Sequence, residues 1–560
     1  MNGRNTGRIG LNGHRGRSRR AVPESSKLAA IDIGSNSIHM VTALVRTGGH
    51  FEIIDRAKEM VGLGRGTLIN GRLSAEALEA GFRTLAAFTQ LARRQGAEPI
   101  LAVATAAIRE ADNGGELVLR AGEELGLRVD VITGAEEARL VFEAARHSID
   151  FRGHRALVVD IGGGSVELIQ GIGSRPEWQE SLKLGVARLT DRFIHSDPPR
   201  KSEITAVRNH IARKLAPAFK RAKRVEPTLM AGTSGTLHNL TAMAAARRNG
   251  YIPVNLHNYV LHRADLAEMT ASIIKQNADQ RAHWIGLDRR RVDLIVAGAL
   301  LTEALLEGFH MEEMRACEWG LREGIILDFL ANSPGYGETA GGAPDIRSRS
   351  VFQMARRFGA DESHARHVAG LAIRLFNATR EIHRLGPRER EILEYAAMLH
   401  DVGLFVSHAR HHHHSEYLIN HGELLRGFTP EEVQTLAVLA RFHKGPPPKT
   451  QSPELSELSY STRGKVVALA AILRIADALD RSHHGIVRTI RVSRLRKRLR
   501  LWLDTGGNDV ELELWAVRRK CDLWEKQFGY QLEFQVAKSP RQDADDRIAA
   551  HARDAHNRYG

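Results

Sequence analysis

Cysteine is almost absent from this 560-residue sequence, which contains only Cys317 and Cys521. The two residues lie far apart and form no CxxC motif, so the sequence predicts neither a disulfide framework nor a thiolate metal site. Long apolar runs are also missing: no stretch of about 18 apolar residues occurs, and this excludes a membrane-spanning helix. The N-terminus has arginines but lacks the apolar segment of a signal peptide. We therefore expect a cytoplasmic protein without a membrane partner.

Acidic residues are outnumbered, since 80 Lys and Arg face 66 Asp and Glu and give a formal net charge of +14. Part of the excess lies in residues 1–27, a segment rich in Gly, Asn, Ser and Arg that is expected to be a disordered basic arm. A basic protein attracts polyanions through its long-range field. Charge alone does not choose among nucleic acid, polyphosphate and acidic nucleotides, and a merely soluble basic surface is the alternative.

One short motif is present twice: residues 32–37 read DIGSNS and residues 160–165 read DIGGGS. Each copy follows an apolar run and precedes a second β-prone run, over residues 38–45 and 166–172. The pattern predicts a strand, an acid, a tight glycine turn and a second strand, in duplicate. Such a turn lets backbone N–H groups approach an anion closely, and the leading aspartate can hold a cation beside it. Two copies at domain-sized spacing predict a phosphate-binding cleft between two similar halves.

A third Gly-rich turn, residues 232–236, follows an apolar strand and leads into a helix whose N-terminus adds a positive dipole end. Asp32 and Asp160 hold equivalent places in the two copies, and paired carboxylates beside phosphate suit Mg²⁺. Either aspartate alone is more often a turn former. The predicted phosphate-binding residues are Gly34, Ser35, Asn36, Ser37, Gly162, Gly163, Gly164, Ser165, Gly232, Thr233, Ser234, Gly235 and Thr236.

Strands alternate with helices up to residue 330, which predicts mixed α/β sheets covered by helices. A Gly/Pro-rich stretch then marks a linker, and an almost entirely helical region follows it. A terminal segment returns to a strand–helix–strand pattern, with residues 487–503 as its first strand-like run and Arg494 to Arg498 on that run. The predicted parts are an arm 1–27, α/β domains 28–150 and 151–330, a linker 331–345, a helical domain 346–485, a small α+β module 486–538 and a polar tail 539–560.

Glu137 is the candidate for chemistry at the cleft. It opens a helix beside Glu136, where a carboxylate is electrostatically favoured. Hydrolysis of a phosphoanhydride needs a base that takes the proton of a positioned water, and a glutamate at the rim of the cleft has that chemistry. The residues alone leave the alternative open that Glu137 only pairs with the helix dipole.

Seven stretches of the first 330 residues form a recognisable set in a fixed order. They are AAIDIGSNSIHM (29–40), ATAAIRE (104–110), TGAEEARLVF (133–142), VVDIGGGSVEL (158–168), LKLGVARLT (182–190), AGTSGTLHNL (231–240) and WGLREGI (319–325). With these stretches, the region resembles the exopolyphosphatase / guanosine-pentaphosphate phosphohydrolase family of the actin-like ATPase superfamily. Kinases and chaperones of that superfamily lack the GAEEARL stretch.

The resemblance implies a duplicated actin-like (ribonuclease H-like) fold and a role for three residues. It implies that Glu137 activates the attacking water, that Glu167 acts with Asp160 on metal and water, and that Arg109 contacts phosphate. The sequence departs conservatively from the family at ATAAIRE, where an ATSALR-like turn is usual. The implied reaction removes terminal orthophosphate from polyphosphate or the 5′ γ-phosphate from guanosine pentaphosphate, and a homodimer is also implied.

Histidines and aspartates are spread along the helical region in the order H…HD…H…H…D, which resembles the HD phosphohydrolase superfamily. The candidate ligands of a further divalent metal are His364, His400, Asp401, His411 (or a neighbour among His412 to His414), His443 and Asp477. Within the exopolyphosphatase family this helical domain is usually taken as non-catalytic. Buried histidines that pair with one another and with Asp401 are the alternative interpretation.

The sequence as a whole is interpreted as an Mg²⁺-dependent exopolyphosphatase that acts on polyphosphate, with guanosine pentaphosphate as the alternative substrate. Nucleic acid is not favoured as a partner. Two further alternatives are an HD-type nucleotide phosphohydrolase, in which the helical domain carries the reaction, and a regulator that binds polyphosphate or an alarmone without turnover.

Overall fold

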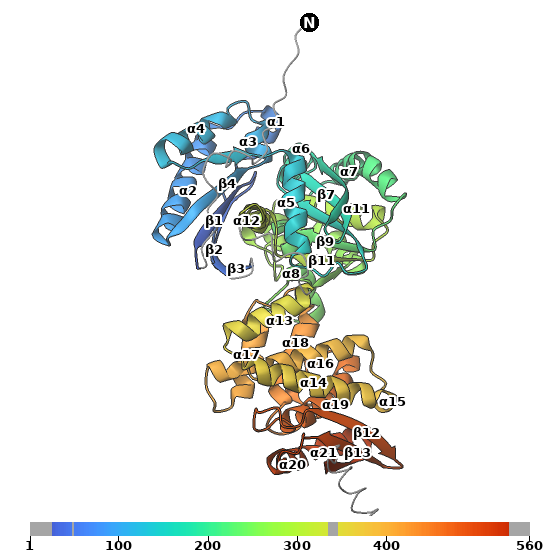
Figure 1. Cartoon of the computed structure of the whole chain (residues 1–560). Coiled ribbons are helices and arrows are strands. Elements are labelled where there is room, and N and C mark those ends of the chain that lie inside the picture. The colour runs from blue at the N-terminus through green and yellow to red at the C-terminus, as the bar shows by residue number, and fades with distance from the viewer. Residues whose placement is uncertain (1–24, 47–49, 334–344, 537–560) are drawn as a thin grey trace, which may run out of the picture. The chain divides into compact units, whose positions relative to one another are not determined.

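A computed structural model describes residues 25–46, 50–333 and 345–536 of the chain (Figure 1). The chain divides into two compact units, residues 1–346 and 347–560, and each is described by itself. Nearly all of the predicted basic arm, most of the predicted linker and the whole of the predicted tail lie outside the described residues. Within the described residues, no helix combines the length and the apolar character that a bilayer span requires.

The first sheet of the N-terminal unit has the strand order β3-β2-β1-β4-β5. Its strands are β1 (Lys27–Ile33), β2 (Ile38–Arg46), β3 (His50–Glu59), β4 (Ala97–Ala104) and β5 (Val129–Val131). β1 pairs antiparallel with β2 and parallel with β4, so the first DIGSNS copy is the turn of a hairpin at one end of the sheet.

The second sheet repeats this order as β8-β7-β6-β9-β11, with β10 added antiparallel at the edge beside β11. Its strands are β6 (Arg155–Ile161), β7 (Val166–Ile172), β8 (Arg175–Leu182), β9 (Leu229–Thr233), β10 (Val260–His262) and β11 (Glu313–Cys317). The central strands are buried on both faces, as their almost unbroken apolar sequences require. The duplicated actin-like fold predicted from the sequence is confirmed.

Helices α5 (Gly134–Arg146) and α12 (Leu321–Ala331) lie between the two sheets (Figure 1). α5 packs on β7 and β8, whereas α12 packs on β1 and β2, and the two helices pack on each other. Gly324 permits this close approach, because a Cβ there would lie 2.1 Å from the Leu140 carbonyl oxygen. The core between the sheets therefore draws on both halves, and the predicted boundary at residue 150 stays a prediction.

Two helices of the N-terminal unit pack directly on the central strands. Helix α2 (Ala75–Arg94) packs on β4, β2 and β1, and α8 (Gly235–Asn249) packs on β6, β9 and β11. In α2, Ser74 caps the first turn by accepting the Ala77 N–H, and Phe82, Leu85 and Phe88 form the buried stripe. The remaining helices are α1 (Thr67–Asn70), α3 (Ala106–Glu110), α4 (Gly114–Leu125), α6 (Val186–Phe193), α7 (Lys201–Ala222), α9 (Arg263–Ile273), α10 (Ala278–Arg281), the 3₁₀ turn η3 (Arg289–Arg291) and α11 (Ile295–Gly308).

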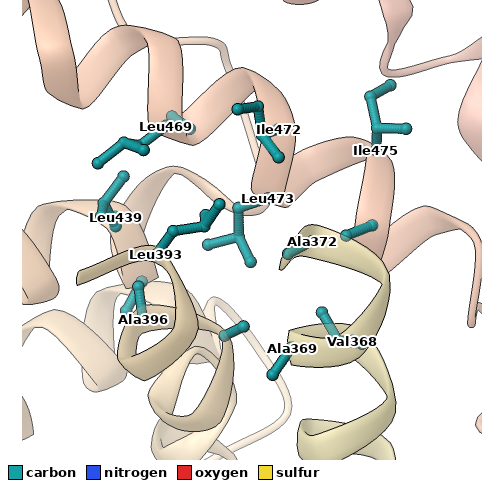
Figure 2. Close-up of a cluster of buried hydrophobic side chains, with 14 of the residues drawn as sticks. Val368, Ala369, Ala372, Leu393, Ala396, Leu439, Leu469, Ile472, Leu473 and Ile475 are labelled. Carbon is teal, nitrogen blue, oxygen red and sulfur yellow. The ribbon is translucent and has the colours of Figure 1, made fainter. Parts of the chain in front are cut away.

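The C-terminal unit begins as a helical bundle. Its elements are α13 (Ile346–Arg357), α14 (Glu362–Ala378), α15 (Arg380–His383), α16 (Pro387–Leu399), η5 (Val402–Phe405), α17 (His411–His421), α18 (Pro430–Phe442), η6 (Pro453–Leu455) and α19 (Tyr460–Ala478). Figure 2 shows its apolar core, where side chains such as Val368, Ala396, Leu439 and Leu473 pack together. This core fixes α14, α16, α18 and α19 against one another.

The terminal module is a three-stranded sheet of order β12-β13-β14 with two helices. Its elements are β12 (Thr489–Leu495), β13 (Arg498–Asp504), α20 (Glu511–Arg518), α21 (Cys521–Phe528) and β14 (Gln531–Val536). The prediction of one strand-like run over residues 487–503 is wrong. Leu495 pairs with Arg498 across a hairpin turn, in which Arg496 adopts a φ of 47°. The sequence concealed this turn because it contains neither glycine nor asparagine, the usual residues at such a φ.

Candidate active site

The two copies of the DIGxxS motif form hairpin turns with the same backbone geometry. The Gly34 N–H donates to the Ser37 carbonyl at 3.1 Å, and the Gly162 N–H donates to the Ser165 carbonyl at 3.0 Å. A Cβ at either glycine would lie 3.0–3.1 Å from that serine carbonyl oxygen, which is why glycine leads both turns. The predicted duplication of the hairpin is confirmed at the level of individual hydrogen bonds.

In the first turn, the carbonyl oxygens are held by the loop after β3. The Asn36 carbonyl accepts from the Gly62 N–H at 3.0 Å, and the Ser35 carbonyl accepts from the Gly64 N–H at 2.5 Å. Because N–H and C=O point in opposite directions in a trans peptide unit, the N–H groups that follow these carbonyls point away from that loop. The turn therefore presents donors on its other side.

The second turn is held by a different element, the N-terminus of α6. The Gly162 and Gly163 carbonyls accept from the first amides of α6 at 3.0 Å each, and the Gly164 carbonyl accepts from Nε of Arg188 at 3.0 Å. Gly185 is required at this approach, because a Cβ there would lie 2.3 Å from the Gly163 backbone. The stretch LKLGVARLT thus supports the turn, and the amides of the turn again point away from the supporting element.

The third turn lies beside the second, because β9 pairs parallel with β6 and places Thr233 opposite Asp160. Ser234 has a φ of 129°, and its Oγ accepts the Leu237 N–H at the start of α8. The first turn also reaches the second: a Cβ on Gly163 would lie 3.3 Å from the Ser35 Cβ. The structure brings all three predicted turns together, and their phosphate contacts stay predictions.

Glu137 lies against the acids of the second hairpin because α5 approaches β8 closely. A Cβ on Gly134 would lie 2.5 Å from the Ser181 side chain, and the Ser181 Oγ donates to Oε1 of Glu167 at 2.8 Å. Nη1 of Arg109 donates to Oε2 of Glu137 at 3.2 Å and to the Ile132 carbonyl at 2.8 Å. The three residues predicted for catalysis, Glu137, Glu167 and Arg109, therefore meet at one place.

Four carboxyl groups share this place, with Glu137 and Glu167 buried and Asp32 and Asp160 half-buried, and each has a raised pKa. Burial raises the pKa of Asp32 to about 6 and that of Glu167 to about 8. Burial and then the neighbouring Glu167 raise the pKa of Glu137 well above its usual value, while Arg109 opposes the shift. Burial and then Glu137 raise the pKa of Asp160. Such a cluster attracts cations and protons and has the electrostatics of a site that handles both.

Mg²⁺ fits the donor set of this cleft, which offers carboxylate oxygens only. The four carboxyl groups interact strongly enough to raise one another's pKa. Among the described residues, however, the acid and histidine groups whose ligand atoms all lie within 4.8 Å of one another are in the C-terminal unit. Mg²⁺ commonly binds through one or two carboxylates and takes its other ligands from water and phosphate. Asp32 and Asp160 match that pattern.

A group of cations surrounds His39 of the first hairpin, and the sequence motifs did not reveal it; one of them, Arg322, also opposes the raised pKa of Asp32 and Asp160. His39 lies between Ser37 and Arg322, with its ring nitrogens 2.7 Å from the serine Oγ and 3.3 Å from the arginine Nη1. Burial, then Arg322, Lys58 and Arg291 lower the pKa of His39 to about 2. Burial and the neighbouring Arg291 lower the pKa of Lys58 to about 8.

Arg291 is the most enclosed of these cations. Its side chain lies beside the first residue of α8, since a Cβ on Gly235 would be 2.2 Å from its Nη2. Burial lowers its pKa, and its Nε has no hydrogen-bond partner among the described residues. Arg291 comes from a run of three arginines and Lys58 from the middle of β3. Neither belongs to a recognisable motif, and only the fold brings them together.

The predicted histidine and aspartate ligands of the C-terminal unit also converge. His364 lies on α14, His400 follows α16, His443 follows α18 and Asp477 lies on α19. Each is one helical turn from a core side chain shown in Figure 2, such as Val368 for His364. Packing of the core therefore aligns the ligands. Within the run of four histidines, His411 is the one that reaches Asp401, at 3.1 Å from Nε2 to Oδ1.

The Nε2 atoms of His364 and His400 face carboxylates without bonding them directly. Nε2 of His364 lies 3.9 Å from Oδ2 of Asp401 and 3.9 Å from Oδ1 of Asp477, and the same two distances for His400 are 3.7 Å. Burial lowers the pKa of His400, but Asp401 and Asp477 outweigh it and raise the value to about 9. Lys520, which sequence reasoning missed, pairs with the other oxygen of Asp477.

Comparison with known proteins identifies related sequences for both units. The sequence model of the Ppx/GppA phosphatase family matches residues 43–333, and that of Ppx/GppA phosphatase domain III matches residues 346–516. The protein named Exopolyphosphatase 1 from Mycobacterium leprae is 32% identical over 302 residues, 54% of this chain and 88% of that protein. Exopolyphosphatase 1 from Mycobacterium tuberculosis is 31% identical over 348 residues, 61% of this chain and 99% of that protein.

A solved structure of an exopolyphosphatase from Cytophaga hutchinsonii is also similar. It is 28% identical, with a TM-score of 0.52, and the match covers 54% of this chain and 98% of that one. These relatives are matched over most of their own length, and the matches cover 61% and 54% of this chain. The model of the family spans most of the N-terminal unit, and the histidine–aspartate cluster lies within the range of the domain III model.

Proposed function

Because the chain belongs to the Ppx/GppA phosphatase family, we propose that it is an exopolyphosphatase that releases terminal orthophosphate from inorganic polyphosphate. The observation that carries the proposal is the burial of Glu137 beside Glu167 and Arg109, at the meeting point of the glycine turns. The names of the matched relatives support the substrate class. The cleft joins backbone donors, acids and cations, which a terminal phosphoryl group requires together.

The turns bind the terminal phosphate through backbone amides. Their carbonyls are held by the Gly62–Gly64 loop and by α6, so the amides of both turns are fixed before substrate arrives. Prearranged donors stabilise developing charge without reorganisation at the moment of reaction. Mg²⁺ held by Asp32 and Asp160 would neutralise phosphate oxygens. Arg109 adds a cation that also orients the Glu137 carboxylate.

Glu137 accepts the proton of the attacking water. The water oxygen forms a bond to phosphorus, the bridging P–O bond breaks, and the shortened chain leaves with the electrons of that bond. Glu167, held by Ser181, raises the pKa of Glu137 and so strengthens it as a base. The proton passes from Glu137 to solvent or to the released phosphate before the next turnover.

The remainder of the polyphosphate chain binds along the cations of the first hairpin. A chain with about one negative charge per phosphate needs fixed positive charge beyond its first residue. Lys58, Arg291 and Arg322 supply that charge and belong to neither hairpin turn. A nucleotide with a 5′ triphosphate offers similar charge over a shorter length, so the two substrates must be compared directly.

The deciding experiment measures orthophosphate release from long-chain polyphosphate and from guanosine pentaphosphate in Mg²⁺. We expect a higher kcat/KM on polyphosphate and a loss of about 10²–10⁴-fold in kcat for Glu137→Gln. Glu136→Gln is the matched control, because Glu136 is adjacent but pairs with Arg139 outside the cluster. Release that survives Glu137→Gln but is abolished by Asp401→Ala would assign the reaction to the C-terminal unit instead.

A further inference from the structure

We propose that one face of the β12–β13 hairpin, in the terminal module, binds single-stranded RNA. Residues 489–504 form this hairpin and contain six Lys and Arg and a single acid. The hairpin shares no residue with the glycine-turn cleft or with the histidine–aspartate cluster. The inference goes beyond the proposed hydrolysis and does not depend on it.

Strand alternation gives the hairpin one apolar face and one polar face. The apolar face packs into the core of the C-terminal unit through Ile490, Leu499, Leu501 and Leu503. On the other face, which we call the outer face, Arg491 lies opposite Trp502 and Ser493 lies opposite Arg500. The outer face therefore joins cations to an aromatic side chain.

The hairpin turn creates this face. In the single strand that the sequence predicts over residues 487–503, Arg491 and Trp502 are separated by an odd number of residues and would point to opposite faces. The turn at Arg496 reverses the chain and brings them to the same face. The expectation that nucleic acid is not a partner was drawn from a sequence in which this face was not visible.

Protection of a sheet edge does not account for these cations. β12 and β14 are the edges of the sheet, and charges on an edge strand prevent it from pairing with another chain. Arg498 and Arg500, however, lie on the central strand β13, which has no free edge. Both pair with Glu533 on β14, at 2.8 Å and 3.1 Å. One carboxylate between two guanidinium groups leaves a net positive charge.

Other cations of the hairpin carry charge that no acid neutralises. Arg491, Arg496 and Lys497 are exposed, and they form no ion pair within the described part of the chain. Fixed positive charge that is spread along a hairpin attracts a polyanion whose charges are spread along a backbone. Charge complementarity thus favours an extended anionic chain as the ligand.

Trp502 distinguishes the outer face from a general anion-binding surface. Its Nε1 donates to the Ser493 Oγ at 3.3 Å, and the Arg500 Cζ lies 5.8 Å from the centre of its ring. The side chain is half-buried, so part of it remains at the surface. Bases stack on aromatic rings and on guanidinium planes, and sheets that carry both bind single-stranded RNA. Polyphosphate has no base to stack.

Neutral polar groups beside Trp502 favour RNA further. Gln531 and Gln535 extend the outer face on β14, where they lie opposite Arg498 and Trp502, and both are exposed. A glutamine amide donates to and accepts from a base edge, and the Ser493 hydroxyl retains its proton to donate. The ribose 2′-OH, which DNA lacks, also donates and accepts. A chain of phosphate alone would not use these groups.

The test measures binding of a fluorescent 12-nucleotide oligo(U) RNA to the full-length chain by anisotropy, from 50 to 300 mM KCl. We expect a dissociation constant of about 1–100 μM at 150 mM KCl. Arg491→Gln should reduce the slope of log affinity against log salt by about 0.7, the value for one contact to a single-strand phosphate. Trp502→Leu should weaken binding about 10-fold and leave the slope unchanged, because stacking involves no charge.

Matched controls lie on α20, which packs on α19. Arg518→Gln removes the same charge, and Trp515→Leu removes a tryptophan that is 54% exposed, so neither should change the affinity or the slope. Binding by the basic residues 1–27 would be unaffected by any of these four substitutions. Equal effects at Arg491 and Arg518, or at Trp502 and Trp515, would overturn the proposal.

A further variant covers the case in which Trp502→Leu fails to fold, which circular dichroism identifies. Trp502→Phe retains a ring that stacks, so it should bind RNA within a few-fold of the wild-type chain. The quenching of tryptophan fluorescence by bound RNA should be lost in this variant. Quenching that persists in Trp502→Phe would place the RNA elsewhere and contradict the proposal.

Competitors identify the class of ligand. Polyphosphate and single-stranded DNA of equal charge, an RNA duplex of equal length and anionic vesicles should each displace the labelled RNA several-fold less well than unlabelled RNA does. EDTA is present so that Mg²⁺-dependent hydrolysis does not consume the polyphosphate. Equal displacement by polyphosphate would reduce the face to a general polyanion site, and equal displacement by DNA, duplex or vesicles would assign it to that ligand instead. Either result, or no RNA binding at 150 mM KCl, would overturn the proposal.

Discussion

The two glycine hairpins have the same backbone but opposite chemistry. Both place an aspartate at the end of the first strand and close the turn with the same Gly-to-Ser hydrogen bond. The residue that pairs with the aspartate differs: Glu167 faces Asp160, whereas His39 faces Asp32. Both aspartates belong to the carboxyl cluster, but at the partner position the second hairpin adds another acid to it, whereas the first hairpin has a ring surrounded by cations.

We propose that this difference lets a duplicated fold serve an asymmetric reaction. The acid beside Asp160 lies where Glu137 and Arg109 approach, so the proposed base belongs to the side of the second hairpin. The histidine beside Asp32 lies among Arg322, Lys58 and Arg291, and we propose that the chain beyond its terminal phosphate binds on that side. The diverged partner positions would thus separate the activation of water from the binding of the chain, while Asp32 and Asp160, one from each hairpin, would share the metal.

Separate substitution of the two partner residues, Glu167 and His39, tests this division most strongly. Glu167→Gln should lower kcat on polyphosphate by about 10²-fold with little change in KM, because it removes a group that acts only at the reacting phosphate. His39→Gln should instead raise KM by about 10-fold with kcat nearly maintained. Steady-state phosphate release at saturating Mg²⁺ measures both values. Equal losses of kcat in the two variants would remove the distinction between the hairpins.

Arg291 tests the binding side in isolation. Arg291→Met should raise KM for long polyphosphate by about 10-fold and reduce its dependence on salt, since the variant loses a buried cation whose Nε has no hydrogen-bond partner among the described residues. Arg290→Met is the control, because that neighbour is exposed and pairs with Asp288. The KM of both variants is measured from 50 to 500 mM KCl with polyphosphate of different chain lengths. A similar rise of KM in both variants would indicate a general electrostatic attraction of polyphosphate to the surface rather than binding of the polyphosphate chain at Arg291.

The pH dependence of turnover tests the reacting side. Burial and then Glu167 raise the pKa of Glu137, so kcat should increase with pH at values above the usual range of a glutamate. In Glu167→Gln the like charge is absent, which lowers the pKa of Glu137 and moves this limb to lower pH. His39→Gln should leave the limb in place. If the rise of kcat with pH stays at the same pH in Glu167→Gln, then Glu167 does not influence the pKa of Glu137.

The smallest expected effect concerns the contact between the turns. Gly163→Ala would bring a methyl group to 3.3 Å from the Ser35 Cβ and 3.4 Å from the Asn36 backbone, so the turns must separate slightly. We expect a few-fold rise in KM and little loss of stability. Gly122→Ala, in open space on α4, is the control. A Gly163→Ala enzyme with wild-type KM would show that the turns do not act on one phosphate.

Much of this arrangement follows from local sequence. The hairpins were predictable because glycine leads a turn between two apolar runs, and α5 was predictable from the Thr133 cap ahead of its acids. That Glu167 lies opposite Asp160 and His39 opposite Asp32 depends on the register of the strands, which the motifs do not reveal. Lys58 and Arg291 come from segments without a motif and meet only in the fold.

The same limit applies to the C-terminal unit. The order of histidines and aspartates predicted which residues converge, because each lies one turn from a core position of its helix. It did not predict that Asp401 offers different oxygens to two sets of histidines, or that Lys520 reaches the cluster from the terminal module. The hidden hairpin at Arg496 is one reason, since it changes how that module folds.

The central claim is that the Glu137 carboxylate directs water onto the terminal phosphorus of an oligoanion. Single-turnover phosphate release by Glu137→Gln, with polyphosphate binding measured on the same sample, tests it most directly. The account predicts wild-type affinity within a few-fold and a rate constant lowered by at least about 10². A rate constant within threefold of wild type, at the same affinity, would contradict it.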